Sequence, residues 1–147
     1  MTPTELETSA RRFFELIFND RSLSLADKML ATNFVEHLPP LADPVSKPAG
    51  ANPHFEALLE ASDDLHVQIL DLVVDGRRVA IRARYQGTDT GGLFPGMPAR
   101  GRRFDVDGID VLVVDDQGKF SEHMGIVDLR KAMEQLGIVS SGSAPTP

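Results

Sequence analysis

The sequence contains no cysteine, and basic residues are fewer than acidic ones. Without cysteine, disulfides, thiolate metal sites and cysteine nucleophiles are excluded. The 15 Lys and Arg against 22 Asp and Glu give a formal net charge of -7, so a nucleic-acid partner, which needs clustered basic side chains, is not expected. No stretch approaches the ~20 apolar residues of a membrane span, and the N-terminus does not resemble a signal peptide. We therefore expect a cytoplasmic protein with no membrane partner.

The composition is that of an ordinary globular chain. Apolar residues make up 41% of the 147 residues and charged residues 25%. This length suits one domain that buries roughly two-thirds of its unfolded surface. We expect a single domain over residues 1–138 and a disordered tail over residues 139–147.

Helical signals dominate the first part of the chain. Thr2 can act as N-cap, Pro3 suits the first helical position and Glu5 completes a capping box. Apolar residues then recur at helical spacing up to Ile17. Further helices are predicted over residues 24–30 and 54–61. The proline-rich segment between them is long enough to form a lid or a mouth.

From residue 65 onward the pattern indicates strands. They are predicted over residues 66–74, 77–86, 102–114 and 119–127, with Asp75-Gly76 as a hairpin turn. A short last helix begins at Asp128 and ends at Gly137. Helices followed by an antiparallel meander predict an α+β fold. A strongly bent sheet, closed at one end by the helices, would enclose a conical apolar pocket.

Several short motifs follow one another in an order that resembles a known family. They are Phe34-Val35-Glu36-His37, Gly87-Thr88-Asp89-Thr90-Gly91, Gly108-Ile109-Asp110-Val111 and Gly118-Lys119-Phe120-Ser121-Glu122-His123-Met124. In this order they resemble the SnoaL-like polyketide cyclases of the NTF2-like superfamily, over roughly residues 5–137. The resemblance implies a cone-shaped α+β barrel and, often, a homodimer. It also implies ring closure in polyketide-like substrates by acid–base chemistry, with no metal or organic cofactor.

Two positions depart from the family's pattern. The family usually shows His where this chain has Asp89, and Trp where it has Met124. We expect an enzyme of the cyclase or isomerase kind that acts on a small, apolar, carbonyl-bearing molecule. The alternatives are a non-catalytic small-molecule-binding or dimerisation module, or an epoxide hydrolase-type enzyme. The latter needs two carboxylates near an Arg or Asn, a set that is not obvious in the sequence. Four histidines without tight spacing indicate no metal site.

Asp128 is the first candidate for catalysis. On a strand, Met124, Ile126 and Asp128 share one face, which is the inner face if Ile126 is buried. Asp128 would then lie at the dry end of an apolar pocket, where a carboxyl can take a proton from carbon or deliver one to oxygen. The resemblance matches Asp128 to the family's acid–base residue. The alternative is that Asp128 is the N-cap of the last helix.

Two histidines and one acid are further candidates. His37 is either a proton-transfer partner or substrate ligand at the pocket mouth, since histidine can gain or lose a proton near neutral pH, or a histidine hydrogen-bonded beneath a loop. Strict alternation directs His123 outward, into a dimer contact, although a bulge at Gly125 would reverse this orientation. Glu122 shares the face of Met124, as a second inward carboxylate or a paired structural acid.

The remaining candidates are predicted to line the pocket or to shape its entrance. Tyr85 could donate to a substrate carbonyl, although it also fits a core stripe with Ile81 and Ala83. Asp89 is either a turn residue or a group at the pocket entrance. If Ile109 faces inward, Asp110 points outward into solvent. The other expected lining residues are Phe34, Val111, Val113, Met124 and Ile126.

Overall fold

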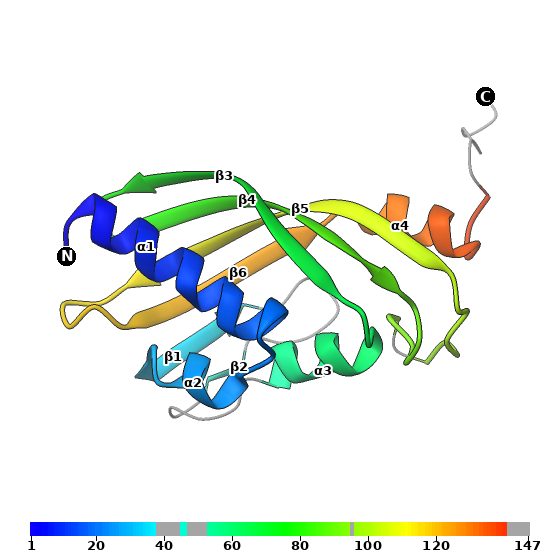
Figure 1. The fold of residues 1–147 in the computed structure, drawn as a ribbon, viewed down its shortest axis with the longest axis horizontal. Helices are drawn as coiled ribbons and strands as arrows, with labels where there is room; N and C mark the ends of the chain where they lie inside the picture. The colour runs from blue at the N-terminus through cyan, green and yellow to red at the C-terminus, as the bar shows by residue number, and fades with distance from the viewer. Residues whose placement is uncertain (38–44, 47–52, 95, 141–147) are drawn as a thin grey trace.

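The computed structural model describes residues 1–37, 45–46, 53–94 and 96–140 (Figure 1). Apart from residues 45–46, the proline-rich segment that we expected to form a lid or a mouth lies outside these residues, as does most of the expected disordered tail. Three helical segments come first, and most strand residues lie in the second half of the chain. The helices and strands are α1 (Pro3–Phe14), η1 (Glu15–Asn19), α2 (Leu23–Asp27), β1 (Leu30–His37), β2 (Val45–Ser46), α3 (Pro53–Ala61), β3 (His66–Asp75), β4 (Arg78–Thr88), β5 (Arg103–Val114), β6 (Phe120–Val127) and α4 (Leu129–Leu136).

The first helix begins as its sequence predicts. Thr2 Oγ1 accepts from the Glu5 amide at 3.1 Å, and the Thr2 amide donates to Glu5 Oε2 at 2.7 Å, which completes the capping box. Leu6 and Phe13 bury the apolar face. The helix continues through Ile17 as the π-helical turn η1. None of the described helices is long and apolar enough to cross a membrane.

One six-stranded sheet forms the body of the molecule, in the order β2-β1-β6-β5-β4-β3. The predicted antiparallel meander is confirmed as β3 to β6. The sequence did not predict β1, which starts at Leu30, where we had expected the second helix to end. It pairs in parallel with β6. The α+β class is confirmed.

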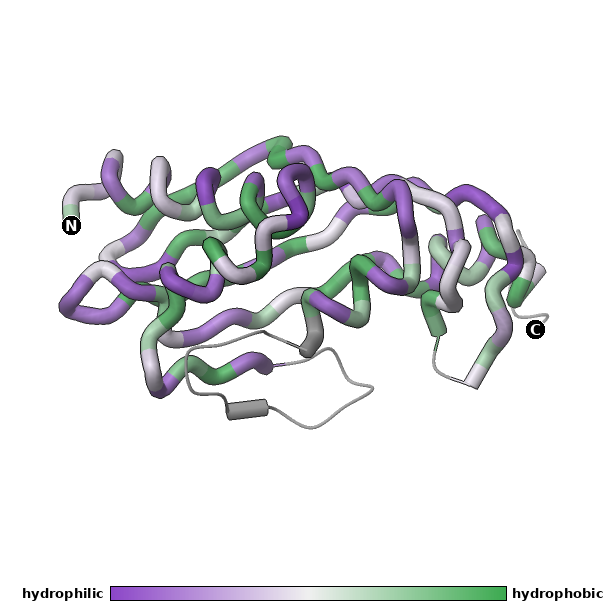
Figure 2. Tube along the Cα trace, turned by 60° about the horizontal axis from the view of Figure 1, so that its bottom comes forward, coloured by the Kyte–Doolittle hydropathy of each residue, from purple (hydrophilic) through white to green (hydrophobic). Residues whose placement is uncertain are grey.

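The sheet has one buried and one exposed face. Hydrophobic and hydrophilic residues alternate along its strands (Figure 2), and β4 and β5 alternate strictly between buried and more accessible positions. The buried face carries Val79 and Ile81 of β4 and Phe104 and Leu112 of β5. Helix α1 packs against β3 and β4, and α4 packs against β5. We refer to the two faces as the inner and the outer face.

The inner face is not the one that we expected on β5 and β6. Ile109 is 43% exposed, Met124 37% and Ile126 62%, while Val111 and Val113 are half-buried beside them on the outer face. Gly108 does not shift the register, so the even-numbered residues of β5 point inward along its whole length. Pairing with β5 then fixes the orientation of β6. The expectation that Ile109 faces inward is therefore wrong, and so is the prediction that Val111, Val113, Met124 and Ile126 line a pocket on the inner face.

Candidate active site

Four buried polar side chains meet on the inner face, one from each of four adjacent strands. Glu36 comes from β1, His123 from β6, Asp110 from β5 and Tyr85 from β4. Glu36 and His123 are 1% exposed, Asp110 5% and Tyr85 6%. We call these four residues the quartet. Burying so many polar groups together is costly unless they satisfy one another.

Hydrogen bonds connect the quartet into a chain centred on the imidazole. His123 Nδ1 lies 2.6 Å from Glu36 Oε1, and Nε2 lies 2.7 Å from Asp110 Oδ1. The Tyr85 hydroxyl donates to the other oxygen of Asp110. Since ionised carboxylates only accept hydrogen bonds, an imidazole that bonds both must carry a proton on each nitrogen. The geometry therefore favours the imidazolium form of His123.

The electrostatics agree with this geometry. Burial lowers the pKa of His123, but the hydrogen bonds and charges of Asp110 and Glu36 outweigh burial and raise the pKa from 6.5 to about 9. Burial, followed by the negative charge of Asp110, raises the pKa of Tyr85. At neutral pH the quartet thus holds a cation between two acids, next to a neutral phenol.

A bulge in β6 is part of the reason why His123 points inward. Val113 pairs with Glu122 and Val114 with Phe120, so Ser121 is an extra residue in β6. Phe120 and His123 can therefore both face the core, although they are an odd number of positions apart. Our prediction that His123 points outward is wrong because it took Met124 to face inward, whereas Met124 lies on the outer face and His123 on the inner one. Asp110, which we also expected outward, follows the inward parity of β5.

Asp128 lies away from the quartet. It is exposed, and its Oδ1 accepts from the Lys131 amide at 3.0 Å as the N-cap of α4. The reading of Asp128 as a helix cap is confirmed, and the inward orientation on which its catalytic role depended is wrong. That orientation was predicted on the assumption that Ile126 is buried, whereas Ile126 is exposed.

His37 and Glu122 also face away from the quartet. His37 Nε2 lies 3.1 Å from Glu122 Oε2, and their side chains are 40% and 43% exposed. This side-chain contact joins β1 and β6 on the outer face, where His37 is opposite Met124 and Glu122 is opposite Val35. Glu122 does share the face of Met124, as predicted, but that face is the outer one.

Asp89 organises the loop between β4 and β5. It is 2% exposed and accepts hydrogen bonds from three backbone amides, those of Gly92, Leu93 and Arg100, at 2.9–3.1 Å. A carboxylate has enough lone pairs for all three amides. The structure thus supports the reading of Asp89 as a turn residue.

Of the candidate site residues that the sequence suggested, only Phe34, Tyr85 and His123 point inward beside the quartet's carboxylates. Sequence reasoning missed Glu36 and assigned Asp110 to solvent. A usable signal was present, because Asp110 has the same parity as Val106 and Leu112, and Glu36 the same parity as Phe34. Counting parity from these apolar neighbours predicts both acids on the inner face.

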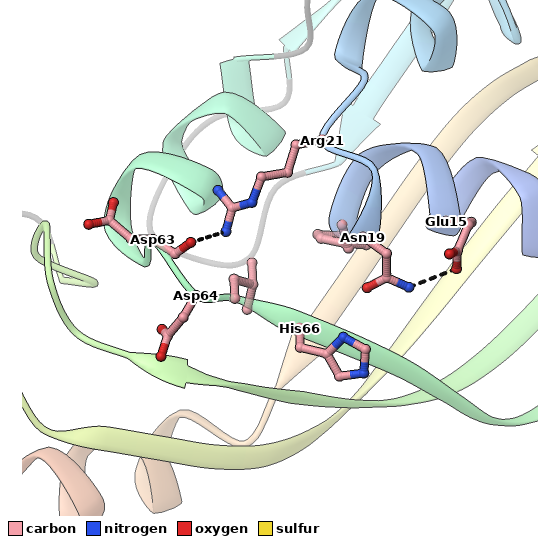
Figure 3. A pocket seen from close by; sticks show the side chains of 8 residues that line it. Glu15, Asn19, Arg21, Asp63, Asp64 and His66 are labelled. Carbon is pink, nitrogen blue, oxygen red and sulfur yellow. Dashed lines mark hydrogen bonds between the residues drawn. The ribbon is translucent and has the colours of Figure 1, made fainter.

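A separate surface depression of about 380 Å³ lies where η1 approaches the start of β3 (Figure 3). Arg21 closes the end of α3 there by donating to the Ser62 and Asp63 carbonyls at 3.2 and 2.6 Å. Phe18 lines the depression, and its ring also stands edge-on to Tyr85, with centroids 5.9 Å apart. The ring of Phe18 therefore lies between the depression and Tyr85 of the quartet.

The curved sheet and its helices have the NTF2-like fold, which solved structures share. A protein from Jannaschia sp. CCS1 that is assigned as a SnoaL-like polyketide cyclase superposes with a TM-score of 0.82 at 21% identity, covering 95% of this chain and 97% of that one. IdmH from Streptomyces antibioticus, which is assigned as a polyketide cyclase, gives a TM-score of 0.73 at 25% identity, covering 90% of this chain and 98% of that one. SalBIII, an epoxide hydrolase/cyclase-like enzyme in pyran ring formation in the polyether salinomycin, gives 0.70 at 17% identity, with 87% and 94% covered.

The family model for SnoaL-like polyketide cyclases matches residues 8–136, so the chain belongs to that family. No curated protein matches the sequence. Among the described residues, no group of three or more His, Asp or Glu side chains is arranged to hold a metal ion.

Proposed function

We propose that this protein is a cofactor-independent cyclase or isomerase that moves a proton through the quartet. The observation that carries the proposal is the imidazole of His123, buried and hydrogen-bonded between the carboxylates of Glu36 and Asp110. A proton donor and a proton acceptor 2.7 Å apart in a dry environment form an acid–base pair. Family membership supports a cyclase-like reaction on a small molecule.

The proton route for ring closure can be written with His123 and Asp110 alone. The Asp110 carboxylate takes a proton from the carbon next to a substrate carbonyl group. The resulting enolate carbon attacks a second carbonyl carbon of the same molecule, and the oxygen of that carbonyl takes the proton from His123 Nε2. The proton on Asp110 then passes to Nε2, so the site returns to its starting state. In an isomerisation, the proton returns to a different carbon instead.

The other two members of the quartet hold this pair in place. Glu36 holds Nδ1, which leaves Nε2 directed at Asp110. The Tyr85 phenol donates to Asp110 and fixes the carboxylate. Phe55 of α3 packs on the imidazole, with centroids 5.3 Å apart, and we place the substrate on this apolar side. Holding both carbonyl groups near one acid–base pair supplies the proximity that ring closure needs.

Proton exchange tests the proposal without knowledge of the natural substrate. The protein is incubated in D2O with a neutral aryl ketone, 2-tetralone, and with open-chain aryl β-diketones, and deuterium next to the carbonyl group is followed by mass spectrometry. We expect exchange by the wild type, a loss of about a hundredfold or more in His123→Gln, and unchanged exchange in Asp128→Asn. Binding without exchange in the wild type would indicate the non-catalytic module instead.

A second candidate is epoxide opening. The structure shows two buried carboxylates, Glu36 and Asp110, on either side of one proton donor. One carboxylate could deprotonate water or a substrate hydroxyl while His123 protonates the epoxide oxygen. SalBIII, which has the same fold, is an epoxide hydrolase/cyclase-like enzyme. Turnover of a neutral aryl epoxide, styrene oxide, without any ketone exchange would favour this candidate.

A further inference from the structure

Two glycines flank the quartet on the inner face of the sheet. Gly108 lies two residues before Asp110 on β5, and Gly125 lies two residues after His123 on β6. Neither has the positive φ that would require glycine. Glycine inside a strand weakens the strand and often marks a site where another group approaches closely. Both positions are therefore explained by the space that a missing Cβ leaves.

The space above Gly125 is occupied by the carboxylate of Asp110. A Cβ built on Gly125 would lie 2.5 Å from Asp110 Oδ1 and 3.4 Å from both Asp110 Cγ and His123 Cε1. Oδ1 is the oxygen that accepts from His123 Nε2. A side chain at position 125 would thus occupy the place of the oxygen that holds the imidazolium.

The register of the strands explains why this space is needed. Asp110 is directly opposite Gly125, whereas His123 is opposite Leu112. Asp110 and His123 are therefore diagonal neighbours, which are farther apart than directly opposed residues. Because the aspartate side chain is short, its carboxylate reaches Nε2 only by lying across the Cα of Gly125.

We propose that Gly125 is a positioning residue for proton transfer, because its missing Cβ lets Asp110 lie against His123. Its importance for catalysis rests on the proposed function, whereas the contact itself does not. Gly108 has a similar relation to Tyr85, since a Cβ there would lie 2.9 Å from Tyr85 Cε2. That Cβ would also lie 2.9 Å from the Ile126 backbone oxygen, so Gly125 allows the cleaner test.

The test is the Gly125→Ala substitution, read through the imidazole of His123 by ¹⁵N NMR over a pH series. We expect the pKa of His123 to fall from its value of about 9, because Asp110 moves off Nε2. Gly87→Ala is the matched control: its Cβ would clash with Ser62 Oγ on the inner face of β4, away from His123. This control should lose stability without changing the titration of His123. An unchanged titration in Gly125→Ala would overturn the proposal.

A double variant isolates the role of the carboxylate. In the Asp110→Ala background, Gly125→Ala should cause no further change in the His123 titration, because the group that it displaces is gone. If Gly125→Ala does not fold, the double variant should restore folding, and failure there would contradict the proposal. For a ketone that the wild type exchanges, kcat should fall about a hundredfold with KM little changed. If no ketone is exchanged but the titration shifts, the proposed function fails and the positioning role stands.

Discussion

At the scale of single residues, the charge of His123 is the property with the widest consequences. Its folded pKa of about 9 exceeds the ordinary value of 6.5, so the folded state keeps a proton that the unfolded chain releases first. The resulting stabilisation is fully present below pH 6.5 and is lost as the pH rises through 9. A shift of this size corresponds to a stabilisation on the order of 3 kcal/mol.

We predict that the free energy of unfolding falls between pH 6.5 and 9 because of this one group. Urea denaturation across that range measures the slope. In His123→Gln the slope should be smaller, whereas His66→Gln, which alters an exposed histidine of β3, should keep the wild-type slope. Equal slopes in the wild type and His123→Gln would mean that the histidine is not a cation in the folded state.

The sequence predicted which residue types could do the chemistry but not how they point. Asp128 and Met124 were placed inside because Ile126 was taken to be buried, and one such assumption reverses every side chain of a strand. The bulge at Ser121, which turns His123 inward, depends on pairing between β5 and β6. Cross-strand register of this kind is a tertiary property that local periodicity does not contain.

At the scale of elements, the loop between β4 and β5 depends on one buried acid. Asp89→Ala would leave the amides of Gly92, Leu93 and Arg100 without their acceptor, at a cost of about 2 kcal/mol. We predict faster hydrogen exchange at these three amides and a lower melting temperature. Asp116→Ala, which removes an exposed acid from another turn, is the control and should change neither. Slow exchange in Asp89→Ala would show that other contacts order the loop.

Most elements were predictable because their signals are local. The capping box at Thr2 and Glu5, the hairpin turn at Gly76 and the C-cap at Gly137 each lie within a few residues of the element that they start or end. Strand β1 lacked such a signal. Its partner β6 is more than 80 residues away in the sequence, and the parallel pairing forms only when the sheet assembles.

At the scale of the whole molecule, the outer face of the sheet carries exposed apolar residues on neighbouring strands. Ile109 and Ile126 pair across β5 and β6 and are 43% and 62% exposed, with Met124 beside them. Contiguous exposed apolar residues indicate an interaction site. In the flanking Arg82–Asp107 and Arg84–Asp105 ion pairs, the positive charge of each arginine is balanced by the negative charge of its aspartate. Two copies could therefore face one another without strong electrostatic repulsion.

We therefore predict a symmetric homodimer that uses this face, as the family resemblance also implied. Ile126→Lys should convert it to a monomer in sedimentation velocity, because a buried, unpaired ammonium is costly. Leu25→Lys, which alters a 45% exposed leucine on α2, should leave the dimer intact. A wild type that sediments as a monomer at every concentration tested would rule out this assembly.

The fold class and the family could be predicted over almost the whole chain. The order of the motifs around Gly108 and Glu122 can be recognised in the sequence without knowing which way any side chain points. The site could not be predicted in the same way. It joins Glu36, Tyr85, Asp110 and His123, four residues from four strands, through hydrogen bonds that only the assembled sheet creates. A family match therefore predicts the architecture better than it predicts which residues form the site.

The protonation state of one imidazole tests the account most directly. In ¹⁵N-histidine-labelled protein, with the His123 signals assigned by their loss in His123→Gln, both ring nitrogens should carry a proton at pH 7.5. Both signals should titrate together near pH 9. A neutral ring with a single protonated nitrogen at pH 7.5 would contradict the proposed acid–base pair.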